Sequence, residues 1–406
     1  MTNPISGKRI ILGATGSIAA YKAADLASKL TQVGAEVDVI LTASALKFIT
    51  PLTFQSVTGR KAFTDEDLWG GEGHVTHVAL GRAGDLFVIA PASANSLAKL
   101  AHGISDNLLC VAALAARCPM VIAPAMDAGM FAHPATQANV EILRQRGVYF
   151  IGPAEGHLAS GLAGVGRMVE PAEILGHVRF MLGRTGPLAG KKVVVTAGGT
   201  QEPIDPVRFI TNRSSGRQGF AIAQAALDVG AEVVLVAGST GLETPVGVRR
   251  IDVRTAEEMH AAVLAEMNGT EILVMAAAVA DFRPVSAAGQ KIKKQMGPPD
   301  IKLENTVDIL AAVAECRSRT GYPRLVIGFA AESQDLRQNA ETKLAAKHLD
   351  MIVANDITVP DAGFEVPTNR VTLVFADGFS ESLPTLAKEE VGEIIVQKII
   401  SMEGYR

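Results

Sequence analysis

The chain has 406 residues, 48% of them hydrophobic, and is therefore long enough for two domains with sizeable cores. Its net charge of −4 argues against a general affinity for nucleic acid or an acidic membrane, so any basic site must be local. No apolar signal region or membrane-length apolar run occurs, and the three cysteines form no metal pattern, which together predict a cytoplasmic protein with reduced thiols.

The start of the chain predicts a strand, a turn, a helix and a second strand within residues 8–42. A β-branched and apolar strand at 9–12 is followed by a glycine-containing turn at 13–17. A helical pattern covers 18–33, and an apolar strand follows at 37–41.

Residues 192–236 repeat this plan, and the sequence VGAEV occurs at both 33–37 and 229–233. Near-continuous apolar strands that alternate with helices are typical of parallel sheets covered on both faces. We therefore predict an α/β protein with two doubly wound, mainly parallel-sheet domains, consistent with a duplication. The Gly- and Pro-containing segment 183–190 predicts the boundary between domains 1–187 and 188–406, and an amphipathic helix is expected near the end of the chain.

The stretch 192–219 carries the strongest local signal. An apolar strand ends at Gly198-Gly199, a long polar loop follows, and a helical pattern begins near Gly216. This layout directs free backbone N–H groups at a phosphate, and the loop adds arginines, serines and Asn212. The stretch predicts a nucleotide or phosphate site.

In the first domain, small and hydroxyl-bearing residues follow the carboxyl ends of the expected strands, where ligands bind in open α/β sheets. A phosphate-sized site with no acidic ribose-binding residue in a GxGxxG context favours a mononucleotide such as FMN over NAD. The candidate cofactor-binding residues are Gly13, Thr15, Gly16, Ser17, Ser44, Phe48, Ser93 and Asn95.

A family resemblance covers this domain. The segments GATGSIAAYK, ASALKFITPLTFQSVTG, APASAN, GISDNLL, PAMDAGM and GVGRM occur in the order found in flavin-dependent decarboxylases that act on 4′-phosphopantothenoylcysteine. The resemblance implies a flavodoxin-like domain that binds FMN, oxidises the thiol side of the substrate and releases CO2. It also implies that His77 is the active-site base.

The chain departs from that family at two positions. Asp127 stands where the family's PxMN motif has Asn, and Ser160 stands where the substrate-covering flap often has Cys. A carboxylate repels the substrate carboxylate unless it is protonated or paired to a cation, and a hydroxyl lacks the acidity and redox chemistry of a thiol. Two readings stay open: a variant decarboxylase in which another group supplies the proton, or an impaired or regulatory flavin domain.

The second domain resembles, nearly residue for residue, the Rossmann-like ligase that joins cysteine to 4′-phosphopantothenate with CTP. The resemblance rests on the segments TAGGTQEPIDPVRFITNRSSGRQG, AAAVADF, KIKK and GFAAE. It implies an acyl-cytidylate, which Asn212 handles and Lys291 helps to form, and Mg2+ beside the triphosphate. The implied nucleotide-binding residues are Asp281, Asp308, Ile309, Phe329, Lys343 and Lys347. The family's KNPDI is NTVDI here, so one lysine is missing.

Together the two resemblances cover nearly the whole chain in the order of the bacterial bifunctional enzymes of coenzyme A biosynthesis. They imply a cytoplasmic homo-oligomer, with trimer contacts through the flavin domain and dimer contacts through the ligase domain. The small-molecule substrates would be 4′-phosphopantothenate, cysteine and CTP. A flavin-binding interaction protein without turnover is a further alternative, but it leaves the Lys/Asn set of the second domain without a role.

Overall fold

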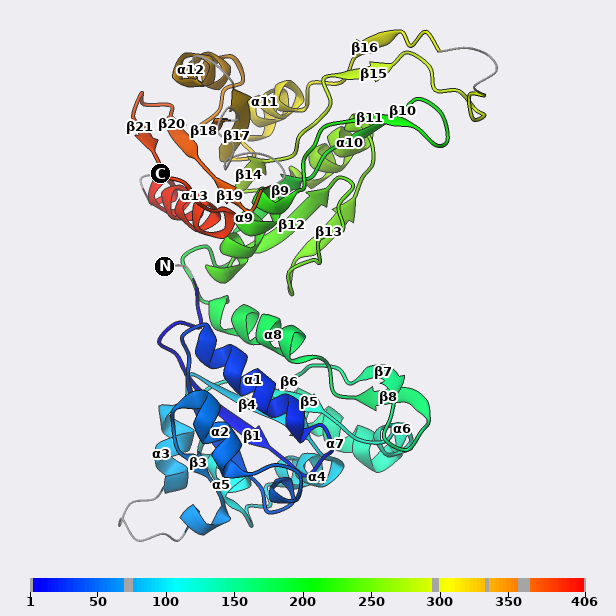
Figure 1. Ribbon diagram of the computed structural model, residues 1–406. Helices are drawn as coiled ribbons and strands as arrows, with labels where there is room; N and C mark the ends of the chain where they lie inside the picture. The colour runs from blue at the N-terminus through cyan, green and yellow to red at the C-terminus, as the bar shows by residue number, and fades with distance from the viewer. Residues whose placement is uncertain (1–2, 69–75, 294–298, 333–335, 357–365, 405–406) are drawn as a thin grey trace. The chain divides into compact units, whose positions relative to one another are not determined.

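The computed structural model describes residues 3–68, 76–293, 299–332, 336–356 and 366–404. Contacts divide the chain into two units, Asn3–Leu182 and Gly183–Arg406, and each is an α/β unit (Figure 1).

The first unit is built on a six-stranded parallel sheet in the order β3-β2-β1-β4-β5-β6. Without the two-residue edge strand β3, this is the flavodoxin-like order. The strands are β1 (Arg9–Ala14), β2 (Glu36–Leu41), β3 (Ala62–Phe63), β4 (Leu86–Ala92), β5 (Met120–Pro124) and β6 (Tyr149–Phe150), and a separate antiparallel hairpin is formed by β7 (Ala154–His157) and β8 (Ala163–Arg167).

Helices cover both faces of this sheet, because successive residues of its buried strands face opposite sides. On β1, Ile10 and Leu12 belong to a core that includes Ile174 and Val178, whereas Ile11 belongs to a second core on the other face. The helices are α1 (Ala20–Gln32), α2 (Pro51–Thr58), α3 (Thr76–Ala83), α4 (Ala94–His102), α5 (Leu108–Ala115), α6 (Ala128–Ala132), α7 (Pro134–Gln145) and α8 (Pro171–Gly183), with short 3-10 turns at η1 (Ala45–Lys47) and η2 (Asp65–Leu68).

The second unit has an eight-stranded sheet in the order β13-β12-β9-β14-β17-β18-β20-β21. Its first six strands are parallel and follow the Rossmann order, and the last two are antiparallel. The strands are β9 (Lys192–Ala197), β12 (Glu232–Ala237), β13 (Arg249–Asp252), β14 (Ile272–Met275), β17 (Leu325–Glu332), β18 (Met351–Asp356), β20 (Val371–Phe375) and β21 (Ser380–Ser382). Both strand orders confirm the predicted doubly wound α/β class.

Five helices of the described residues pack on this second sheet: α9 (Arg217–Asp228), α10 (Ala256–Glu266), α11 (Ile309–Thr320), α12 (Leu336–Ala346) and α13 (Lys388–Glu403). The closing helix expected near the chain end is α13, which lies against α9 with Gly392 close to the backbone of Ala221.

Three small antiparallel pairs complete the second unit: β10 (Gln201–Pro203) with β11 (Phe209–Thr211), β15 (Phe282–Pro284) with β16 (Leu303–Asn305), and β19 (Thr368–Asn369) with β22 (Leu386–Ala387). The first two pairs extend from the sheet as a two-hairpin arm (Figure 1).

The repeated VGAEV segment takes the same conformation in both units. Gly34 and Gly230 have φ of +94° and +93°, which favours glycine, and each ends the first crossover helix of its unit. The next strand then begins with the same backbone bond, from Glu36 N–H to Lys8 O and from Glu232 N–H to Lys191 O, each 2.8 Å long. The sequence repeat is therefore also a structural repeat.

Candidate active sites

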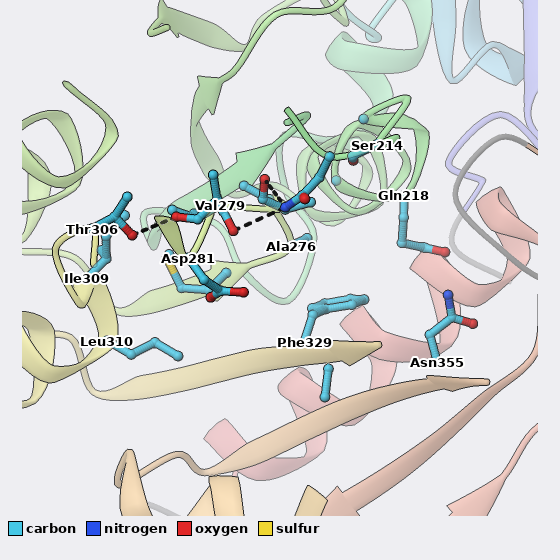
Figure 2. A pocket seen from close by; sticks show the side chains of 18 of the residues that line it. Ser214, Gln218, Ala276, Val279, Asp281, Thr306, Ile309, Leu310, Phe329 and Asn355 are labelled. Atoms are coloured by element: carbon cyan, nitrogen blue, oxygen red, sulfur yellow. Dashed lines mark hydrogen bonds between the residues drawn. The ribbon is translucent and has the colours of Figure 1, made fainter. Parts of the chain in front are cut away.

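A pocket of about 660 Å³ lies at the carboxyl edge of the second sheet, where the β9, β14, β17 and β18 strands end (Figure 2). This edge, at the point where the strand order reverses between β9 and β14, is where doubly wound sheets bind ligands. The pocket brings together seven of the residues named from sequence: Asn212, Asp281, Asp308, Ile309, Phe329, Lys343 and Lys347.

Glycines let the helix α9 begin directly against the end of β9. Gly216, the residue before the helix, has φ of +80°, and a Cβ there would lie 3.3 Å from Gly198 N. At Gly219 a Cβ would lie 2.5 Å from Ala197 Cβ and 2.8 Å from Thr196 O. The helix N-terminus, with its free N–H groups, is thus held at the floor of the pocket, as an anion site requires.

Asn212 joins two walls of the pocket. Its Nδ2 donates to the carbonyl oxygens of Ala278 and Val279, over 3.3 and 3.2 Å. The loop after β14 is fixed further because the buried Thr200 hydroxyl accepts from the Ala280 N–H over 2.9 Å. The long loop after β9 is therefore tied to the segment that carries Asp281.

The two predicted lysines have different partners. Lys343 donates to the backbone oxygen of Phe329 over 3.1 Å, whereas Lys347 forms an ion pair with Asp308, the N-cap residue of α11. Partial burial works to raise the pKa of Asp308, but the hydrogen bond from Lys347 and the N–H of Ala311 outweigh it, so this pKa lies below its usual value. Lys347 is thus partly neutralised, whereas Lys343 forms no ion pair with a carboxylate of the described residues.

Lys291 lies away from the pocket-lining residues and is exposed. Its segment is held on the two-hairpin arm, because the Ile292 N–H donates to Asp205 and the Ile292 carbonyl accepts from Arg208. Lys293 of the same run is also exposed, and Lys294 lies outside the described residues. The pocket of a single chain therefore contains Asn212 but lacks Lys291.

In the first unit, the loops after β1, β2 and β4 meet at the carboxyl edge of the sheet. A Cβ on Gly16 would lie 2.4 Å from Ser44 Cβ, so the first two loops touch. The buried Thr15 hydroxyl donates to Pro91 O and accepts from Ser93 N–H, both over 2.9 Å. Thr15 therefore ties the loops together, and its hydroxyl is already used within the protein.

The other predicted flavin-binding residues surround this junction. Gly13 is the second-last residue of β1, and a Cβ there would lie 2.4 Å from Leu109 Cδ1. Ser17 accepts weakly from the Ala19 N–H, and Ser93 is the N-cap of α4, the helix that carries Asn95. Phe48, after η1, is 52% exposed, a large apolar side chain available to a flat ligand.

His77 lies in the first turn of α3. Within the described part of the chain its Nδ1 is buried and has no hydrogen-bond partner. Such a group is costly unless a ligand or a catalytic proton uses it, which suits an active-site histidine.

Asp127 and Ser160, the two departures from the family pattern, contact each other. The Ser160 hydroxyl, at the tip of the β7–β8 hairpin, donates to Asp127 Oδ2 over 2.8 Å, and the Gly129 N–H donates to Asp127 Oδ1 over 2.9 Å. These two bonds lower the pKa of Asp127 below its usual value. The carboxylate is therefore ionised at neutral pH and is stabilised by hydrogen bonds.

Sequence reasoning missed four polar residues that line the second pocket: Gln218, Asn355, Asn369 and Lys388. Gln218 and Lys388 each begin or nearly begin a helix at the pocket edge, and Asn355 follows a buried apolar run. A polar residue directly after an apolar strand is the signal that could have identified Asn355.

No cluster of three His, Cys, Asp or Glu side chains that could hold a metal ion occurs among the described residues. Within that same part of the chain, no helix is both long and apolar enough to cross a membrane.

Comparisons with known proteins find relatives of both units. The family model "Flavoprotein" matches residues 2–182, and the model "DNA/pantothenate metabolism flavoprotein C-terminal domain" matches residues 188–402. The chain is 43% identical to the Coenzyme A biosynthesis bifunctional protein CoaBC of Bacillus subtilis (strain 168) over 401 residues, 98% of each chain. It is also 43% identical to the protein of that name from Vibrio cholerae serotype O1, over 97% of this chain and 98% of the relative. A crystal structure of the C-terminal domain of such a protein has 39% identity and a TM-score of 0.46, covering 54% of this chain and all of the other.

Proposed function

Because the chain belongs to the family of bifunctional coenzyme A biosynthesis proteins, with its flavoprotein decarboxylase and ligase domains, we propose the following two reactions for it. Residues 188–406 join cysteine to 4′-phosphopantothenate with CTP through an acyl-cytidylate. Residues 1–187 then decarboxylate 4′-phosphopantothenoylcysteine to 4′-phosphopantetheine with FMN.

The observation that carries the ligase assignment is the convergence of seven sequence-named residues on one pocket. Activation of a carboxylate by a nucleotide needs backbone N–H donors and cations around the phosphates. The N-terminus of α9 and Lys343, which both line the pocket, supply these groups. Mg2+ commonly keeps several waters and binds one or two carboxylates plus substrate phosphates, for which Asp281 is the candidate.

The proposed ligation has two steps. A carboxylate oxygen of 4′-phosphopantothenate attacks the α-phosphorus of CTP, the bond to the β-phosphate oxygen breaks, and pyrophosphate leaves with the electron pair. The cysteine nitrogen then attacks the acyl carbon, the C–O bond to the phosphate breaks, CMP leaves, and the amine proton passes to water. Asn212, held at the Ala278 and Val279 carbonyls, lies where it can orient the acyl-phosphate group.

The position of Lys291 supports a dimer of the ligase domain. Its arm exposes large apolar side chains, each between 42% and 58% exposed: Val207, Phe209, Phe282, Val285 and Leu303. Such a patch is typical of a protein interface. We infer that the arm packs on a second copy of the chain and delivers Lys291 to that copy's triphosphate; the trimer contacts of the flavin domain are proposed from the resemblance alone.

The first unit suits a flavin. Ser17, Ser44 and Ser93 offer hydroxyls around a cradle too tight for a Cβ at Gly16, and Phe48 offers an apolar face. Bound FMN would supply reversible two-electron chemistry, taking a hydride equivalent from the cysteinyl group before CO2 leaves and returning it afterwards. The unpartnered Nδ1 makes His77 the group to accept the substrate's thiol proton.

The relatives favour a working decarboxylase, although the ionised Asp127, held by the neutral Ser160 hydroxyl, has no cation among its described partners to offset its repulsion of the substrate carboxylate. A cytoplasmic location is proposed from the metabolic role.

Two assays test this function. Purified protein should show flavin absorbance and release CO2 from 4′-phosphopantothenoylcysteine; colourless protein would remove the FMN assignment, and coloured protein without CO2 release would favour an impaired flavin domain. Pyrophosphate should appear when CTP and 4′-phosphopantothenate are added, with ATP, GTP and UTP as controls. Equal rates with all four nucleotides would contradict the CTP assignment.

A further inference from the structure

One end of the second pocket is lined by four polar residues that neither the family-derived assignments nor the mechanism above uses. We call this the amide end; its residues are Gln218, Asn355, Asn369 and Lys388. Two bonds fix three of them in a chain: Asn369 Nδ2 donates to Gln218 Oε1 over 3.2 Å, and Gln218 Nε2 donates to Lys388 O over 3.1 Å. In Figure 2, Gln218 and Asn355 reach into the pocket on the side away from Ile309 and Leu310.

The side-chain oxygen of Asn355, Oδ1, has no hydrogen-bond donor among the described residues. The residue is 7% exposed, at the carboxyl end of β18, where it pairs with Val371 of β20. Among the described residues no donor reaches its buried Oδ1. Buried polar atoms are nearly always satisfied, so an orphaned acceptor in a pocket wall indicates a ligand that brings an N–H or O–H group.

The same end is positively charged. Lys388 is 3% exposed; burial and the charge of Arg217 lower its pKa, so an anionic ligand beside it would stabilise the ammonium form. The first turn of α9, which contains Arg217 and Gln218, adds the positive end of a helix dipole. The amide end therefore suits a ligand that carries a negative group close to an N–H donor.

An α-amino acid has both groups on one carbon atom. The amino and hydroxyl donors of a nucleotide lie several bonds from its phosphates, and the nucleotide is already assigned to Asp281, Phe329 and Lys343. The acid substrate has an amide N–H near its carboxylate, but that carboxylate has to reach the α-phosphorus of CTP in the first step. Cysteine is the substrate of the proposed ligation that fits this pair of requirements.

We propose that the amide end binds the cysteine substrate, with Asn355 Oδ1 accepting a hydrogen bond from its amino group and Lys388 facing its carboxylate. This inference rests on the proposed ligase function. Holding the nitrogen at Asn355 places it in the same pocket as Asn212, which orients the acyl group. The nitrogen then forms the C–N bond, CMP leaves with the electrons of the broken C–O bond, and the amine proton is released to water.

The test separates the two half-reactions. Cysteine is absent from the first, so the full-length Asn355→Leu variant should release pyrophosphate from CTP and 4′-phosphopantothenate at a rate within about twofold of wild type. Its KM for cysteine should rise about tenfold, the effect of losing one hydrogen bond to a buried group. Asn268→Leu, at an exposed position outside the pocket, is the matched control and should change neither quantity. Thermal unfolding confirms that each variant is folded.

A second variant distinguishes the amino from the carboxylate contact. Cysteamine keeps the amine and lacks the carboxylate. Asn355→Leu should raise the KM for both cysteine and cysteamine, whereas Lys388→Met should raise it for cysteine alone.

Three outcomes overturn the inference: an unchanged cysteine KM in Asn355→Leu, a pyrophosphate burst slowed as much as the second half-reaction, or equal effects of Lys388→Met on cysteine and cysteamine. The second of these would assign the amide end to the nucleotide or the acid. Wild-type protein that releases no pyrophosphate at all would instead contradict the proposed function itself.

Discussion

The hydroxyl of Ser160 donates to Asp127 Oδ2 over 2.8 Å, so a change at either residue alters the chemistry of the other. The hydrogen bond from Ser160 is the largest cause of the lowered pKa of Asp127. We expect Ser160→Ala to raise that pKa toward the usual aspartate value, because the carboxylate loses a donor. A carbon-detected NMR titration of the Asp127 carboxyl group measures the shift.

The sign of the pH effect follows from this direction. A lowered pKa in the folded state gives stability that is present above the usual aspartate pKa and is lost as the pH falls through the lowered value. Ser160→Ala should therefore be slightly less stable than wild type near neutral pH, and this difference should disappear as the pH falls below the lowered pKa. Ser56→Ala, which removes an exposed helix hydroxyl, is the control. An unchanged Asp127 titration would show that the hydrogen bond does not form in solution.

His77 permits a second test at the residue scale. His77→Asn keeps a polar side chain in the first turn of α3 but removes the imidazole that is the proposed base. General acid–base catalysis is worth about 100-fold or more, so CO2 release should fall by about that factor. Flavin absorbance should be retained, since His77 is assigned to the substrate. The exposed His102→Asn is the control, and loss of flavin from His77→Asn would make the residue a cofactor contact.

The sequence was enough to name candidate site residues, but it did not show which of them contact each other. The sequence named Asp127, Ser160, Asp308 and Lys347 as separate site residues. The structure pairs Asp127 with Ser160 across 33 positions and Asp308 with Lys347 across 39. Such pairs depend on how a hairpin or helix packs far along the chain, which no local pattern records.

At the scale of elements, the contact between α9 and β9 positions the whole ligase pocket. Gly219→Ala adds a Cβ 2.5 Å from Ala197 Cβ, and the backbone oxygen of Thr196 leaves it no other space. Overpacking of this kind costs about 1–3 kcal/mol, more than alanine gains as a helix former. We expect the unfolding transition of the ligase domain to shift to lower temperature, as measured by calorimetry.

The calorimetric control is Gly241→Ala, where nothing lies within 4 Å of the added Cβ. The transition of the flavin domain should stay in place in both variants. A Gly219→Ala protein as stable as wild type would mean that α9 moves away from β9 at little cost, and that the pocket floor is less fixed than its geometry indicates.

The regular elements followed from the sequence more closely than the irregular ones. The strand expected at 9–12 forms β1 and extends to Ala14, because apolar runs of that kind fit only a buried strand. The loop after β9, expected to be long and polar, contains the β10–β11 hairpin instead. Its three-residue strands are too short for a period of two to be recognised.

At the scale of the whole molecule, the two units repeat one plan and carry different sites. A substitution in one site should therefore abolish that site's activity, ligation or decarboxylation, and leave the other activity intact. An Asn212→Ala variant loses the side chain that joins the pocket walls at Ala278 and Val279, and should lose ligation while it still decarboxylates added 4′-phosphopantothenoylcysteine. His77→Asn should do the reverse.

A mixture of these two variants then tests whether the intermediate passes through solution. 4′-Phosphopantothenoylcysteine is a small molecule, and it should leave the pocket of one protein and reach the flavin domain of another. We expect the mixture to form 4′-phosphopantetheine from CTP, cysteine and 4′-phosphopantothenate, at a rate that falls on dilution, as followed by mass spectrometry. Each variant alone should form product at a rate at least about 100-fold below that of wild type. A mixture that stays inactive, while each half-reaction persists in its own variant, would mean that the intermediate is handed over within one assembly and does not reach solution.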